Sequence, residues 1–363
     1  MTLSAATIST QPAPCGLGLF APARLHLGFL DMGGHLDRRF GSLGLSLAEP
    51  GLQIEVALAQ RREILGAQSG RVEKLLDLLE QHFGFAQPVQ VRVTQAIPDH
   101  AGLGSGTQLA LALGSLVARL HGQRPGTSTL ARALDRGNRS GIGIGAFDQG
   151  GFLVDGGRGQ DDTPPPVIAR LPFPDEWRIL LLMHPTYQGL HGKAEVDAFR
   201  RLPVFPADAA ARLCHLTLMR ALPALAEARL DAFGSAITEI QATVGDHFAP
   251  AQGGRFSSPL VAAALERLGT LGAACRGQSS WGPTGFVVAT NATQAGVWAD
   301  HLADLQADGL RPCIVRANNQ GVRWYQTDAD KHNDHPEEAR GDAAHGKTVH
   351  PAHVHAEQER QSL

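Results

Sequence analysis

Alternation of apolar and polar side chains predicts strands in the first part of the chain. Residues 88–96 place Val89, Val91 and Val93 on one side and polar side chains on the other. This two-residue period is typical of a strand with one buried face. The same pattern predicts strands at residues 20–29, 40–47 and 52–58.

A period of three to four residues predicts helices between and after these strands. Residues 70–84 carry one apolar face, and the segment 107–121 carries a leucine stripe. Pro223 is expected to kink or end a helix at 207–228. Further helices are predicted at 127–138, 232–244, 258–271 and 293–307, and further strands at 151–154, 178–183, 286–289, 312–317 and 322–325.

The chain of 363 residues is long enough for two domains. The best boundary is the loop 158–174, which contains three consecutive prolines. We expect a disordered N-terminus at 1–16, a first domain at 17–165 that contains a phosphate loop, and a second domain at 166–327. Residues 328–363, where six of the 16 histidines lie, are expected to form a disordered tail.

Charge and composition narrow the function. A net charge of −3 gives no electrostatic case for nucleic acid or an anionic membrane, and no apolar run could span a bilayer. The first 14 residues lack the features of a secretory signal, and the widely spaced cysteines form no CxxC pair, so we expect a cytoplasmic protein with reduced thiols. Only four of the 32 basic residues are lysines. Anion recognition is therefore expected from arginines, backbone amides or Lys193.

A glycine-rich turn at residues 98–106 joins the strand at 88–96 to the helix at 107–121. The glycines let backbone amides approach a ligand, and amides at a helix N-terminus bind anions such as phosphate. Ser105 and Thr107 could cap this helix and donate hydroxyl groups. The alternative is an ordinary glycine-rich connection. The predicted phosphate-binding residues are Gly102, Leu103, Gly104, Ser105, Gly106 and Thr107.

Three short motifs in a fixed order, at residues 22–28, 98–106 and 278–285, resemble those of the GHMP kinase superfamily. The resemblance covers about residues 16–327. It implies a two-domain α/β (α+β) fold, with an N-terminal ribosomal-protein-like domain and a C-terminal ferredoxin-like domain. The active site would lie in the cleft between them.

Three stretches resemble a non-kinase branch, the β-ribofuranosylaminobenzene 5'-phosphate synthases. They are Arg-Leu-His-Leu-Gly-Phe-Leu-Asp at 24–31, the glycine-dense stretch 139–157 and Gln-Ser-Ser-Trp-Gly-Pro-Thr-Gly-Phe at 278–286. The resemblance implies a homodimeric transferase that joins phosphoribosyl diphosphate to 4-hydroxybenzoate or 4-aminobenzoate. CO2 and diphosphate would leave, and the product would serve tetrahydromethanopterin biosynthesis in the one-carbon metabolism of a methylotroph.

The alternative function is an ATP-dependent small-molecule kinase of the same superfamily. Kinases of this superfamily usually follow the first Gly-Ser of the second motif with another serine and alanines. Here the sequence at 104–108 is Gly-Ser-Gly-Thr-Gln, which argues against ATP as a substrate.

The implied reaction needs a held diphosphate, a stabilised ribose cation and a bound benzoate. The glycine-rich turn would hold the diphosphate, with Mg²⁺ bound through the diphosphate and Ser105, and no organic cofactor is needed. Asp31 or Asp148 could face the developing positive charge at ribose C1. The carboxylate would bind an arginine, Arg24 or Arg139, and the ring would stack on Trp281 or Phe29.

Several of these residues also have structural interpretations. His26 either contacts a ligand beside Arg24 or fills the polar face of a strand, and Asp148 is either catalytic or a solvated helix residue. Asp155 could simply shape a turn, and Lys193 with Glu195 is either a substrate-binding pair or a surface pair. The remaining predicted substrate contacts are Ser140, Gly141, Ser279, Ser280 and Gly282.

Overall fold

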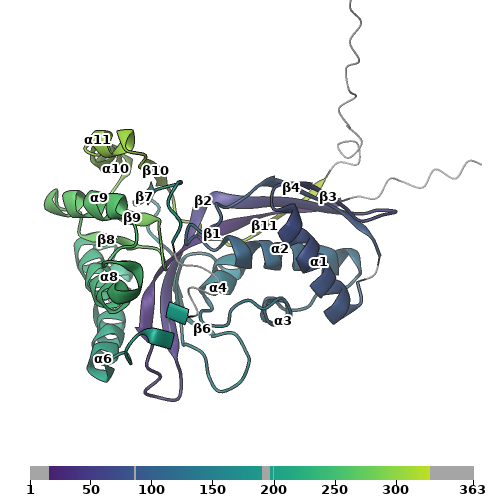
Figure 1. The fold of residues 1–363 in the computed structure, drawn as a ribbon, viewed down its shortest axis with the longest axis horizontal. Coiled ribbons are helices and arrows are strands. Elements are labelled where there is room, and N and C mark those ends of the chain that lie inside the picture. The colour runs from purple at the N-terminus through teal and green to yellow at the C-terminus, as the bar shows by residue number, and fades with distance from the viewer. Residues whose placement is uncertain (1–15, 86, 190–196, 199, 328–363) are drawn as a thin grey trace, which may run out of the picture. The chain divides into compact units, whose positions relative to one another are not determined.

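The computed structural model describes residues 16–85, 87–189, 197–198 and 200–327 (Figure 1). All of the described residues belong to one unit. Predictions for Lys193, Glu195, the first fifteen residues and the tail at 328–363 fall outside the described residues.

The first sheet is built around two long antiparallel strands, β1 (Gly16–Asp31) and β2 (Phe40–Leu58), which pair along most of their length. The sheet has seven strands in the order β11-β1-β2-β4-β3, and β5 continues from the other half of β2 to β6. The shorter strands are β3 (Glu63–Gly66), β4 (Val89–Gln95), β5 (Phe152–Asp155), β6 (Val167–Leu171) and β11 (Arg323–Thr327).

Four helices accompany this sheet, and Figure 1 shows α1 and α2 on the same side of it. They are α1 (Ser69–Phe83), α2 (Ser105–Leu120), α3 (Thr127–Ala133) and α4 (Ile142–Asp148). Helix α2 packs across β1 and β2, and its predicted apolar stripe is buried at Leu109, Leu113 and Leu116. Since α2 follows the glycine-rich turn, this packing fixes the direction of its N-terminus.

The second sheet has four antiparallel strands in the order β10-β7-β9-β8. They are β7 (Arg178–Met183), β8 (Cys275–Gln278), β9 (Gly285–Ala289) and β10 (Arg311–Val315). Alternate residues of β7 belong to two different hydrophobic cores. Ile179 and Leu181 pack in the core that includes α8 (Leu230–Gln252). Leu180 and Leu182 pack in the core that includes α9 (Pro259–Thr270) and α10 (Ala292–Asp300). Both faces of this sheet are therefore covered.

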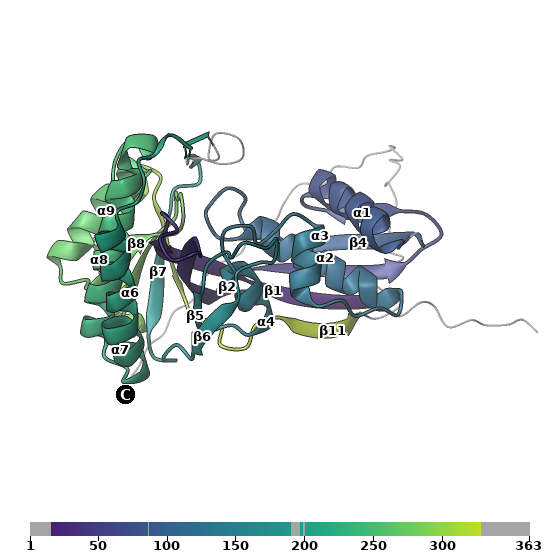
Figure 2. The same ribbon diagram turned by 90° about the horizontal axis from the view of Figure 1, so that it is seen from below.

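Helix α8 connects the two sheets. It contacts β8 of the second sheet and β1 of the first, and it lies beside α6 (Ala207–Leu216) and α7 (Leu222–Ala226) (Figure 2). The Nε2 of Gln241 on α8 donates to the Leu27 carbonyl on β1 at 2.8 Å. The Oε1 of Gln241 accepts from the backbone N–H of Gln278 on β8 at 2.7 Å. The buried side-chain amide of Gln241 is therefore hydrogen-bonded to one strand of each sheet.

The structure corrects several predicted boundaries, including the helix predicted at 127–138, which ends at Ala133, and the strand predicted at 20–29, which spans Gly16–Asp31. Segments 40–47 and 52–58 are one strand, β2, because both pair with β1 on either side of a register shift near Pro22. The helix predicted at 207–228 is α6, a π-helical turn (Thr217–Ala221) and α7, with Pro223 in the first turn of α7. The helix predicted at 232–244 extends to Gln252, and the one at 293–307 is divided into α10 and α11 (Ala303–Ala307).

Sequence patterns missed strands β3, β6 and β8. The two sheets also do not separate at the predicted domain boundary of 165/166. Strands β6 and β11 come from the second half of the chain, yet both pair in the first sheet. None of the described helices is long and apolar enough to cross a membrane.

Candidate active site

The glycine-rich turn presents the N-terminus of α2. Gly102 and Gly104 have φ of 74° and 85°, a left-handed conformation that favours glycine. Gly104 is the N-cap and no side chain caps the helix, so the prediction that Ser105 or Thr107 caps it is wrong. The Ser105 hydroxyl instead donates to Asp99 Oδ1 at 3.0 Å. No side-chain cap therefore occupies the start of α2, where backbone N–H groups can bind an anion.

Two arginines that the sequence patterns did not indicate flank this turn. A Cβ placed on Gly106 would lie 2.8 Å from Nη2 of Arg71 and 3.7 Å from Cζ of Arg136. Arg71 also pairs with Asp99. The Nε of Arg136 has no hydrogen-bond partner among the described residues, and burial together with the nearby Arg71 lowers the pKa of Arg136. Neither arginine is within one of the predicted motifs: Arg71 lies in the first turn of α1, and Arg136 follows α3.

The carbonyl of Gly102 brings the three predicted motifs together. It accepts from Nη1 of Arg24 at 2.5 Å and from the Ser279 hydroxyl at 2.6 Å. Ser279 Oγ in turn accepts from the His26 backbone N–H at 3.0 Å, and the Ser280 N–H donates to the His26 carbonyl at 3.1 Å. Strand β1, the glycine-rich turn and the β8–β9 loop therefore form one hydrogen-bonded unit.

His26 is buried at the centre of this unit, with 4% of its surface exposed. Burial, then Arg24 and Arg139, lower its pKa to about 3, so the ring is neutral near pH 7. Its Nε2 has no hydrogen-bond partner among the described residues. The ring lies 4.6 Å from the Phe29 ring, centroid to centroid. A neutral imidazole with a free nitrogen can exchange a hydrogen bond with a ligand.

A small cavity of about 20 Å³ lies beside His26, enough for one water molecule. Aromatic and amide side chains surround it. The rings of Phe248 and Trp281 are 4.3 Å apart, and Gln241 and Gln278 supply polar atoms. Trp281 is buried here, between Ser280 and Gly282, which both have positive φ.

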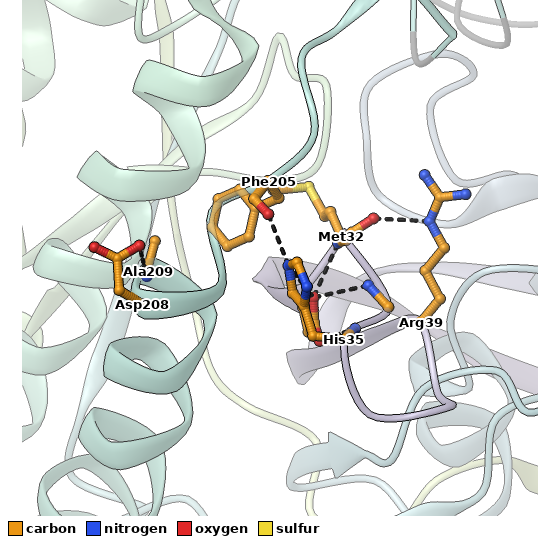
Figure 3. A network of polar contacts seen from close by, with 9 residues as sticks. Met32, His35, Arg39, Phe205, Asp208 and Ala209 are labelled. Carbon is orange, nitrogen blue, oxygen red and sulfur yellow. Dashed lines mark hydrogen bonds and ion pairs between the residues drawn. The ribbon is translucent and has the colours of Figure 1, made fainter.

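Asp31 shapes the loop that follows β1. Its Oδ1 accepts from the N–H groups of Gly33 and Gly34, both at 2.9 Å, and its Oδ2 accepts from the His35 N–H at 3.0 Å. The His35 ring then reaches the Phe205 carbonyl at 2.9 Å (Figure 3). These bonds orient the carboxylate toward its own loop.

A larger pocket of about 490 Å³ lies next to this loop. It is lined by three arginines, Arg39, Arg139 and Arg200, together with His247. The Nε of Arg39 donates to the Met32 carbonyl at 2.7 Å, which orients the guanidinium group (Figure 3). None of the described residues that line this pocket is acidic. The pocket therefore has the charge and the size of a site for a small anionic ligand.

The residues predicted around 139–157 have different surroundings. The Ser140 hydroxyl and the Gly141 N–H donate to Asp155 Oδ2 at 3.0 and 2.9 Å. Both groups thus support the buried Asp155 carboxylate. Asp148 is exposed at the C-terminal end of α4, where it accepts from the Thr127 hydroxyl at 2.7 Å. The structure therefore does not bring Asp148 to the unit that contains His26.

Two further predicted contacts have packing roles. Thr107 packs on α4, since a Cβ on Gly143 would lie 2.9 Å from its Cγ2. Leu103 is buried, and its carbonyl accepts from the Arg24 N–H at 3.0 Å. Among the residues that the structure describes, no three His, Cys, Asp or Glu side chains gather as a metal site.

Comparisons with known proteins agree with this architecture. Family models described as "GHMP kinases N terminal domain" and "GHMP kinases C terminal" match residues 70–156 and 221–303. A protein of Methanothermobacter thermautotrophicus named beta-ribofuranosylphenol 5'-phosphate synthase is 31% identical over 83% of this chain and 96% of its own length. A protein of the same name from Archaeoglobus fulgidus is 33% identical over 84% of this chain and 98% of its own length.

The chain belongs to the β-ribofuranosylphenol 5'-phosphate synthase family. It is an enzyme of this family, and the GHMP-kinase-like α/β fold predicted from its motifs is confirmed. Solved structures share the fold. Mevalonate-3-kinase from Thermoplasma acidophilum has a TM-score of 0.61 at 13% identity, covering 86% of this chain and 99% of its own. Homoserine kinase from Cytophaga hutchinsonii has a TM-score of 0.55 at 16% identity, covering 89% and 100%.

Proposed function

We propose that this enzyme joins phosphoribosyl diphosphate to 4-hydroxybenzoate and releases CO2 and diphosphate, in tetrahydromethanopterin biosynthesis. The observation that carries the proposal is the similarity to two β-ribofuranosylphenol 5'-phosphate synthases over nearly their whole length. Loss of CO2 from 4-hydroxybenzoate leaves a phenol, whereas 4-aminobenzoate would leave an aniline. The name of the relatives therefore supports 4-hydroxybenzoate among the two predicted acceptors.

The proposed reaction balances without an oxidant or a reductant. The ring carbon that bears the carboxylate bonds to ribose C1, while the C1–oxygen bond breaks and its electron pair leaves with diphosphate. The bond from the ring to the carboxylate carbon then breaks. Its electron pair restores the aromatic ring, and CO2 departs.

The N-terminus of α2 suits the diphosphate. Backbone amides of the first turn and the guanidinium groups of Arg71 and Arg136 can neutralise a group that gains charge as it leaves. The Ser105 hydroxyl and the Asp99 carboxylate supply the hard oxygen ligands that Mg²⁺ prefers. Mg²⁺ bound with the diphosphate would supply further neutralising charge there.

The neutral ring of His26 is compatible with a position beside the ribose. Positive charge develops at C1 during the reaction, and a protonated imidazole would oppose it. Because burial and two arginines lower the pKa of His26 to about 3, the ring stays neutral and adds no positive charge. The free Nε2 can accept a hydrogen bond from a substrate hydroxyl.

Product release tests the proposal. The purified chain, phosphoribosyl diphosphate and Mg²⁺ are mixed with carboxyl-labelled 4-hydroxybenzoate or 4-aminobenzoate, and labelled CO2 and diphosphate are measured. We expect equal amounts of both products, with 4-hydroxybenzoate preferred. If the folded protein releases neither product with either benzoate, the proposal is wrong. A thermal shift with ATP but not with phosphoribosyl diphosphate, together with ADP formation, would instead support a kinase.

A further inference from the structure

The arginine-lined pocket beside residues 32–40 has no ligand in the proposed chemistry so far, in which Arg139 acts only through the pKa of His26. We propose that this pocket, formed by Arg39, Arg139 and Arg200, binds the 5'-phosphate of phosphoribosyl diphosphate. The inference rests on the proposed reaction and adds a second anion site to the one at α2.

The charge and size of the pocket match a phosphate group with its sugar. Three guanidinium groups line about 490 Å³, and none of the described lining residues is acidic. Arg39 is oriented through its Nε by the Met32 carbonyl, at 2.7 Å. The exposed Arg200 pairs with the half-buried Asp197 at 3.7 Å, a contact that a phosphate can replace at little cost.

The position of the pocket also fits the substrate. Arg24 lies over the start of α2, because a Cβ on Gly104 would lie 3.2 Å from its Cγ. Arg139 lines the pocket, and both Arg24 and Arg139 lower the pKa of His26. Each of the two cationic sites therefore contributes an arginine near His26. Phosphoribosyl diphosphate also carries two anionic groups, the diphosphate on C1 and the phosphate on C5, with the ribose between them.

The benzoate carboxylate is a poorer occupant of this pocket. That group must lose its charge and leave as CO2, and three cations would stabilise the charged ground state and oppose the loss. The 5'-phosphate keeps its charge throughout the reaction. Strong binding of the 5'-phosphate lowers the free energies of the bound substrate and of the transition state equally. It therefore does not raise the barrier between them.

Calorimetric titration with ribose 5-phosphate tests the assignment on the full chain without turnover. Arg39→Gln and Arg200→Gln each remove one guanidinium, and Arg201→Gln is the matched control because exposed Arg201 lines a different pocket. We expect each of the first two variants to weaken ribose 5-phosphate binding about 10-fold or more, the effect of losing a charge-assisted hydrogen bond. Arg201→Gln and the wild type should bind equally.

Steady-state kinetics then separates the two anions of the reaction. We expect Arg39→Gln and Arg200→Gln to raise the KM for phosphoribosyl diphosphate and to leave the KM for 4-hydroxybenzoate unchanged. Unchanged ribose 5-phosphate affinity in both variants, or a raised KM for the benzoate alone, would overturn the assignment. If no CO2 is released by any form but binding of ribose 5-phosphate still depends on both arginines, the phosphate site stands and the proposed reaction fails.

Discussion

Two buried ionisable groups of the first sheet, His26 on β1 and Asp155 on β5, differ in how their polar atoms are satisfied. The Asp155 carboxylate accepts from Ser42, Ser140 and Gly141 through Oδ2 and from Gly157 through Oδ1. His26 is almost equally buried, yet its Nε2 has no partner among the described residues and the ring lines a cavity. Burial alone therefore does not identify a functional group. The unused hydrogen-bonding capacity of a buried group is the better indicator.

The largest expected effect concerns the fully bonded group. Asp155→Ala removes the acceptor for four donors in the interior, so we expect the free energy of unfolding to fall by about 3–5 kcal/mol. The kcat of the remaining folded protein should change little, because the carboxylate supports the loop and does not face a ligand. Urea unfolding followed by circular dichroism measures the first quantity, and an assay corrected for the folded fraction measures the second.

Asp148→Ala is the matched control for this variant. Asp148 is exposed and accepts one hydrogen bond, from Thr127, so its loss should cost about 1 kcal/mol or less. If Asp148→Ala instead abolishes product release while the protein stays folded, Asp148 is catalytic and the geometric interpretation of these two carboxylates is wrong.

The pH dependence of the free energy of unfolding tests whether His26 is buried as a neutral ring. The pKa of His26 is about 3 in the folded chain and 6.5 when unperturbed. Below pH 6.5 the unfolded chain therefore takes up a proton that folded His26 does not. The stability that this group contributes is complete above pH 6.5 and is lost as the pH falls toward 3. At pH 4.5 the loss should be about 2–3 kcal/mol.

Unfolding free energies at pH 7 and pH 4.5 measure this loss. His26→Gln should show a smaller fall between the two pH values, by the same 2–3 kcal/mol. His215→Gln, which changes an exposed histidine on α6, should behave as the wild type does. An equal fall in His26→Gln and the wild type would mean that His26 is not buried as a neutral ring.

The sequence predicted the elements whose patterns are local. The stripe of α2 and the alternation of β4 follow from burial of one face, and both were predicted within two residues. Strand β8 was missed because its sequence, Cys-Arg-Gly-Gln, shows no alternation of apolar and polar residues. Its backbone pairing with β9 defines it as a strand. Tertiary pairing also decides where β11 belongs, since its partner β1 is some 300 residues earlier in the chain.

The candidate site divides in the same way. Arg24, His26 and the glycine-rich turn could be selected because they lie within recognisable motifs and share a strand face or a helix start. Arg71 and Arg136 have no such signal. They reach the start of α2 only because α1 and α3 pack beside it, so their role depends on long-range packing that one sequence does not reveal.

Arg136 extends the comparison to a third buried atom, since its Nε also has no hydrogen-bond partner among the described residues. If free capacity marks function, Arg136→Gln should raise the KM for phosphoribosyl diphosphate about 10-fold, or about 1.4 kcal/mol, and leave the KM for the benzoate unchanged. Arg136→Lys should recover part of the loss because it keeps the charge. Exposed Arg132 on α3 provides the control variant, Arg132→Gln. A lower melting temperature with an unchanged KM would assign Arg136 to packing instead and would limit the comparison to His26.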